Sequence, residues 1–88
     1  METLRGTVVK SFAGHDKDSF FVVLRVEGDF AYISNGKTRT LENPKKKRLK
    51  HLKHTHTVID CDSLTNRKLR TVLNEFNNKT QEEQAGTE

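Results

Sequence analysis

The stretch SFFVVLRV, residues 19–26, places large apolar side chains on both faces of an extended chain. Alternate residues of a strand point to opposite sides of a sheet, so two apolar sets form here. The first set is Phe20, Val22, Leu24 and Val26, and the second is Phe21 and Val23. Such a strand needs apolar cover above and below, and we therefore predict a central strand enclosed by other elements.

Short apolar segments on either side of this stretch predict two neighbouring strands. RGTVVKSF, residues 5–12, is the first of them, and its Val8 and Val9 face opposite ways. FAYIS, residues 30–34, follows a tight turn at Gly28 and is the second. With the central strand, these segments predict an antiparallel arrangement of consecutive strands.

Asn35-Gly36 is a strong signal for a two-residue hairpin. Both central positions of a type I′ turn need a positive φ, which Asn and Gly adopt more readily than other residues. We therefore predict that KTRTLE, residues 37–42, is the return strand and that Pro44 ends it.

A fifth short strand is predicted at RLKHLKHT, residues 48–55. It cannot be regular throughout, because Leu49 and Leu52 have opposite parity and would face opposite sides of a sheet. Five short strands at this spacing predict a mainly β fold, in which a small antiparallel barrel is followed by one C-terminal α-helix.

The helix is predicted from a change of period in the last third of the chain. One apolar stripe of helical spacing is formed by Leu69, Val72, Leu73 and Phe76. Thr65 is placed as the N-cap, and Leu64 and Leu69 are placed as a hydrophobic staple. The predicted domain is 1–76, and the polar segment 77–88 is predicted to be a flexible tail.

Three cations, Arg67, Lys68 and Arg70, lie in the first turns of this predicted helix. The helix macrodipole disfavours cations there by a few tenths of a kcal/mol each. A ligand that needs them would explain the placement, and so would packing strong enough to outweigh the penalty.

Positive charge is concentrated in one window of the chain. Residues 37–56 carry eight Lys or Arg and one acid, Glu42, which gives +7; the whole chain is +4, so the remainder carries −3. A localised positive patch is typical of proteins that bind a polyanion.

The run ENPKKKRLKHLKHTHT, residues 42–57, allows three readings. It can be a solvated face, although fewer cations would suffice for solubility. PKKKRLK alone matches a nuclear import signal. On a folded scaffold the same residues would form a phosphate clamp, which is the interpretation we favour because the cations are so dense.

Metal binding and catalysis receive little support from the sequence. His51, His54 and His56 with Cys61 offer ligand atoms, but their spacing matches no finger or ribbon. The acids Asp16 and Asp18, and likewise Asp60 and Asp62, accompany no base or nucleophile. We therefore predict no cofactor, no metal and no enzymatic activity.

Exposed rings that stack on bases are a common feature of RNA-binding proteins. Of six aromatic residues, Phe20, Phe21 and Phe76 are assigned to the core. Phe12 and Tyr32 are the candidates for stacking, and core packing is the simpler role for either because the chain has few large apolar residues.

The stretch RGTVVKSFAGHDKDSFFVVLRVEGD resembles the KOW motif of ribosomal proteins and of transcription factors of the NusG type. The matching parts are Gly6, Val8, Val9, Gly14, Asp16, Lys17 and the apolar strand through Val26. With the lysine run and the helix, residues 4–76 are similar to small bacterial KOW-domain RNA-binding proteins, themselves similar to archaeal and eukaryotic large-subunit ribosomal proteins. The chain departs from the pattern at Asp18-Ser19, where a Gly and a second cation are usual. The resemblance implies an SH3-like barrel, RNA binding and no catalysis.

Gly14 is expected in a tight connection with positive φ, where the missing Cβ lets a phosphate approach the backbone. The predicted RNA-binding residues are Lys10, His15, Lys17, Lys37, Arg39, Lys45, Lys46, Lys47, Arg48, Lys50 and His51. The resemblance implies ribosomal RNA as the partner, with ribosomal proteins as further partners. We expect a cytoplasmic monomer with no signal peptide and no membrane span. A protein-interaction adaptor and a DNA-associated architectural protein are the alternatives.

Overall fold

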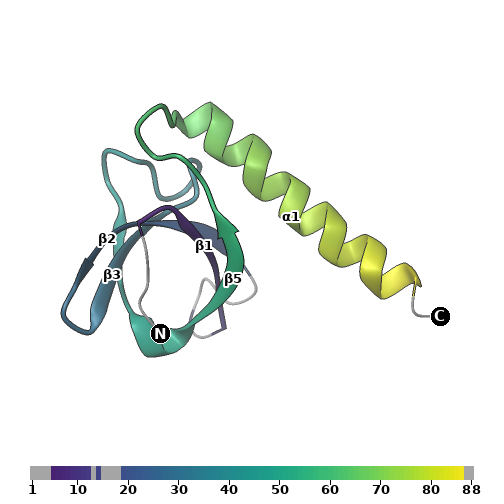
Figure 1. Ribbon diagram of the computed structural model, residues 1–88, viewed down its shortest axis with the longest axis horizontal. Coiled ribbons are helices and arrows are strands. Elements are labelled where there is room, and N and C mark those ends of the chain that lie inside the picture. Colours follow the sequence, from purple (N-terminus) through teal and green to yellow (C-terminus); the bar gives the residue numbers. More distant parts are fainter. Residues whose placement is uncertain (1–4, 13, 15–18, 87–88) are drawn as a thin grey trace.

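A five-stranded antiparallel sheet and one C-terminal helix make up the fold (Figure 1). The computed structural model describes residues 5–12, 14 and 19–86, with side chains described up to residue 76. The elements, in chain order, are β1 (Thr7–Ser11), β2 (Phe20–Glu27), β3 (Phe30–Ser34), β4 (Lys45–Arg48), a 3₁₀ turn (Leu49–His51), β5 (Leu52–Val58) and α1 (Asn66–Gly86). The order across the sheet is β4-β3-β2-β1-β5, so the mainly β class with a C-terminal helix is confirmed.

Strand β2 is central and is covered on both faces, as its sequence predicts. An inner cluster lies on the concave side of the sheet and consists of Val9, Phe21, Val23, Ala31, Ile33 and Leu52. A helix-side cluster lies between the sheet and α1 and consists of Val8, Phe20, Val22, Leu69 and Leu73. Val8 and Val9 therefore face opposite ways, and each belongs to a different half of the core.

The sheet is strongly curled because its two edge strands are joined by a very short link. Only the turn Leu49–His51 separates β4 from β5, although these strands lie at opposite edges of the sheet. In a regular strand Leu49 and Leu52 would face opposite sides of the sheet. The turn changes their orientation, so that both pack on the inner cluster. Among the described strands, β4 and β5 do not pair, so the sheet is curled but not closed.

The prediction of a strand at residues 37–42 is wrong, because the fourth strand is the lysine run itself. Asn35 does not initiate a two-residue hairpin; its side-chain oxygen accepts hydrogen bonds from the backbone N–H groups of Lys37 and Arg39. Its own N–H donates to the Arg39 carbonyl at 2.9 Å, which closes a wider loop. Pro44 consequently precedes β4 and does not end a strand.

Helix α1 begins as its sequence predicts. The Thr65 hydroxyl accepts a hydrogen bond from the Lys68 N–H at 3.1 Å, which is the geometry of an N-cap. Burial of Leu69 and Leu73 contributes about 1.5–3 kcal/mol each, which exceeds the penalty of about 0.3–1 kcal/mol for each cation near the N-terminus. Packing therefore decides that this segment is a helix.

The helix continues to Gly86, past residue 77, where the sequence analysis places the start of a tail. Residues 81–85 are Gln, Glu and Ala, which have high helix propensity, so the segment can stay helical without an apolar stripe. Figure 1 shows this last part of α1 running beyond the sheet.

The loop of residues 35–44 is fastened to the start of α1. The Asn66 side chain accepts a hydrogen bond from the Leu41 N–H at 2.8 Å, and Arg70 donates one to the Gly36 carbonyl at 2.9 Å. Gly36 has a φ of +74°, and a Cβ there would collide with the Asn66 carbonyl oxygen. Only glycine fits between this loop and the helix.

The contact at Gly36 can be tested against Gly28, which also has a positive φ but has no heavy atom within 4 Å of a built Cβ. We expect Gly28→Ala to cost roughly 1–2 kcal/mol of unfolding free energy, because only backbone strain is introduced. Gly36→Ala should cost about 1–3 kcal/mol more, because it adds a steric clash. Urea unfolding of both variants measures the difference, and equal costs would show that the loop does not press on the helix.

Candidate nucleic-acid interface

The cations of β4 are divided between two sides of an edge strand. Lys46 and Arg48 are exposed and lie on the outer side of the sheet. Lys45 and Lys47 are half-buried and lie opposite the two inner-cluster residues of β3. The lysine run is therefore part of the folded sheet, and its alternation presents positive charge in two directions.

The outer cations rest on an aromatic ring. Lys46 Nζ lies 4.5 Å from the centroid of the Phe30 ring, and Arg48 Cζ lies 5.2 Å from the same centroid. Next to them Arg25 covers Tyr32, with Cζ 4.4 Å from the ring centroid. These rings are thus occupied by cations, which they hold in place by cation–π attraction.

The inner cation Lys47 reaches the connection that follows β1. Gly14 has a φ of +77°, as its predicted turn requires, and a Cβ on it would lie 3.4 Å from Lys47 Nζ. Close by in the chain, Phe12 donates its N–H to the His51 carbonyl, and its ring meets the His51 ring edge-on with centroids 6.5 Å apart. Phe12, Gly14, Lys47 and His51 are hereafter called the rim cluster.

Phe12 corrects one expectation of the sequence analysis. Its side chain is 50% exposed, so it does not serve the core, whereas Tyr32 is half-buried beneath Arg25. Phe20 and Phe21 are buried as predicted. The rim cluster therefore combines an exposed ring, a backbone without a side chain, and an ammonium group.

The remaining predicted contacts are distributed around the sheet. Lys10 lies over Phe20, with Nζ 5.6 Å from the ring centroid, and it is directly opposite Lys53 on β5. Like charges in this cross-strand position are destabilising. Lys50 is exposed in the 3₁₀ turn, and the predicted contacts His15 and Lys17 lie outside the described residues.

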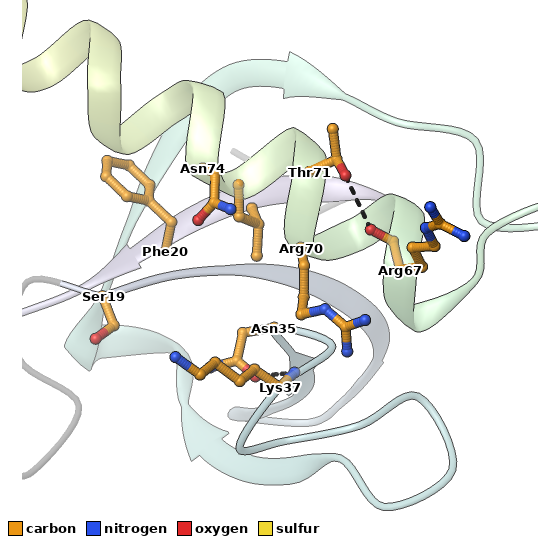
Figure 2. Close-up of a pocket in the computed structure, with 9 residues that line it drawn as sticks. Ser19, Phe20, Asn35, Lys37, Arg67, Arg70, Thr71 and Asn74 are labelled. Atoms are coloured by element: carbon orange, nitrogen blue, oxygen red, sulfur yellow. Dashed lines mark hydrogen bonds between the residues drawn. The ribbon is translucent and has the colours of Figure 1, made fainter.

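Lys37 and Arg39 do not stand on a strand beside the lysine run, because no strand forms there. The Arg39 carbonyl closes the loop, accepting hydrogen bonds from Asn35 and Gly36. Lys37 is exposed and lines a groove beside α1, together with Arg67 and Arg70 (Figure 2). The groove was not predicted, although the unfavourable placement of Arg67 and Arg70 near the helix N-terminus was a signal for it.

Glu42, the one acid of residues 37–56, is hydrogen-bonded to the start of α1. Both carboxylate oxygens of Glu42 accept hydrogen bonds from the Asn66 side-chain amide, at 3.2 and 2.9 Å. This bond, and next a bond from the backbone, lowers the pKa of Glu42 below its ordinary value. Glu42 therefore keeps its charge, but directs it at the start of α1.

Other kinds of site find little basis in the described part of the chain. No group of three or more His, Cys, Asp or Glu there is arranged to hold a metal ion. Burial is the largest influence on the pKa of the Cys61 thiol and raises it. The thiol therefore stays protonated and weakly nucleophilic. No helix in the same ranges is long and apolar enough to cross a membrane.

Comparison of the sequence with protein-family models and with curated proteins finds no match in either.

The hydrogen bond between Asn66 and Glu42 makes a prediction about acid titration. We expect Asn66→Ala to raise the pKa of Glu42 toward its ordinary value, because the amide that stabilises the carboxylate is gone. The carboxyl carbon resonance of Glu42, followed by NMR as pH falls, measures this pKa. Asn43→Ala removes a neighbouring exposed amide and should leave the titration unchanged.

The same hydrogen bond makes the free energy of unfolding depend on pH. A carboxyl whose pKa is lowered by folding stabilises the fold above its unfolded pKa, and this contribution is lost as pH falls through the folded value. Acidification should therefore destabilise the wild type through Glu42 and have no such effect in Glu42→Gln. A Glu42 titration identical in wild type and Asn66→Ala would contradict the assignment.

Proposed function

We propose that the protein is a non-catalytic RNA-binding module that contacts RNA phosphates through β4 and the rim cluster. The observation that carries the proposal is that the lysine run is an edge strand with its outer cations held on Phe30. Cations fixed on a folded surface lose less conformational entropy on binding than cations on a free segment. Each phosphate contact would release condensed counterions, which is the main source of affinity for RNA.

A simpler role for the lysines would be protection of the sheet edge. Edge strands often carry Lys to prevent pairing with another sheet. That role does not need cations on both sides of β4, nor a second pair at Lys10 and Lys53. Cations gathered in this way produce a positive potential that attracts an anionic partner.

The rim cluster supports contacts with unstacked bases as well as with phosphates. An exposed aromatic ring can stack on any base, and such stacking is worth about 1–3 kcal/mol per base. Phe12 offers this ring, while Gly14 and Lys47 beside it offer a close backbone approach and a positive charge. Single-stranded loops or ends of a structured RNA provide both features.

We further propose that the curled sheet is an SH3-like barrel of the KOW type, with ribosomal RNA as its target. The short link between β4 and β5 and the positive φ of Gly14 support the first part. The second part rests on the resemblance to KOW-domain proteins. The preference for RNA over DNA rests on the same resemblance.

The double variant Lys46→Gln/Arg48→Gln tests the proposal. Both residues are exposed, so we expect the unfolding free energy to fall by no more than about 1–2 kcal/mol, for the two contacts with Phe30 that are lost. The affinity for an RNA hairpin should fall about tenfold or more, and the slope of log K against log salt should become shallower by about 1.5, for two lost phosphates. Fluorescence anisotropy at several salt concentrations measures both quantities.

Lys68→Gln is the matched control, since it removes one exposed cation from α1 rather than from β4. Its RNA affinity should stay within about twofold of the wild type, by the weak screened field of a distant surface charge. Unchanged affinity in the β4 double variant would overturn the proposal.

A further inference from the structure

A groove lies between α1 and the loop of residues 35–39, apart from the rim cluster. Its volume is about 690 Å³, and it is lined by Ser19, Phe20, Asn35, Lys37, Arg67, Arg70, Thr71, Leu73 and Asn74. Three of these described lining residues are cationic and none is acidic, while hydroxyl and amide groups contribute further hydrogen-bond donors. Figure 2 shows Lys37 extending along the groove toward Ser19 and Arg70 reaching from α1 toward the loop.

The two walls of the groove are held together without a ligand. Arg70 spans them by donating from Nη1 to the Gly36 carbonyl at 2.9 Å, and its guanidinium has further N–H groups. Asn35 fixes the backbone of Lys37 by accepting its N–H at 2.9 Å. A preformed site of this kind needs little ordering when an anion binds.

The charges of this groove are costly in the free protein. Arg67 and Arg70 oppose the dipole of α1, and the loop brings Lys37 alongside them. Burial of the apolar stripe explains why the helix tolerates the two Arg residues, but not why a third cation lines the same groove. An anion bound among the three would attract each of them and offset this repulsion.

The geometry points to a phosphate site, and we propose that this groove binds a phosphodiester of the RNA that also contacts β4. This inference rests on the proposed function. Lys37 and Arg67 would supply the ionic contacts, because both side chains are exposed and, within the described residues, the loop is held by other groups. Arg70 would position the phosphate between the walls that it already joins. Ser19 and Asn74 add polar side chains to the lining of the groove.

The test compares Lys37→Gln/Arg67→Gln with the control Lys68→Gln. Lys68 is next to Arg67 but does not line this groove, so the control removes a charge from the same turn of α1. The probe is a labelled RNA hairpin with a paired stem and an unpaired loop. We expect about tenfold weaker binding for the double variant than for the control, and a salt slope shallower by about 0.7–0.9, for one lost phosphate contact.

Two further measurements keep the test decisive. Lys37→Arg/Arg67→Lys keeps both charges and should retain affinity within about twofold, by the electrostatic origin of the contact. Urea unfolding should show the Gln double variant to be as stable as the wild type or more stable, because it removes a cation from the first turn of α1.

The outcomes separate this inference from the proposed function. If the groove double variant binds like Lys68→Gln while the Lys46→Gln/Arg48→Gln variant is weakened, the groove is not a phosphate site and the RNA-binding function stands. If the wild type does not bind the hairpin, both are overturned. Weak binding by the charge-retaining variant would also overturn the phosphate site, because it would trace the effect to structure and not to charge.

Discussion

Strand β2 must bury apolar side chains on both of its faces, and the other elements are arranged to cover them. Phe21 and Val23 need an inner core, and Phe20 and Val22 need a cover on the outside. A small sheet can meet the first need only by curling, and α1 meets the second by packing its apolar stripe across the strand. Each fully buried side chain of this size contributes about 1.5–3 kcal/mol, so few alternatives compete with this arrangement.

The cationic surfaces follow from that arrangement. Curling brings the two edges of the sheet close enough for the 3₁₀ turn Leu49–His51 to join them, so β4 becomes an edge and Lys47 reaches Gly14. Docking of α1 brings its first turn against the loop of residues 35–44, where Asn66 holds Glu42. The one acid of the basic window is thereby engaged at the helix, while Lys46 and Arg48 of β4 and the cations of the groove stay exposed.

Local signals were enough to predict β2, the opposite orientations of Val8 and Val9, and the Thr65 cap, because burial and capping act over a few residues. They were not enough to place the fourth strand. Residues 37–42 alternate much as a strand does, and Lys45–Arg48 has no apolar side chain to indicate one. Pairing with β3 and the contacts of Lys46 and Arg48 with the Phe30 ring decide the outcome, and both are tertiary effects. The groove could not be located from the sequence for the same reason, because residues 37 and 67 line one groove only after α1 docks.

Whether β4 and the rim cluster bind RNA can be measured by backbone amide NMR of the labelled protein during titration with an RNA hairpin at low salt. We predict that the largest changes in amide chemical shift fall on Phe12, Gly14 and residues 45–51, where the rim cluster and β4 lie together. We also predict that added salt reverses those changes, because counterion release drives the contact. Changes confined to residues 77–86, or no changes at all, would contradict the proposed interface.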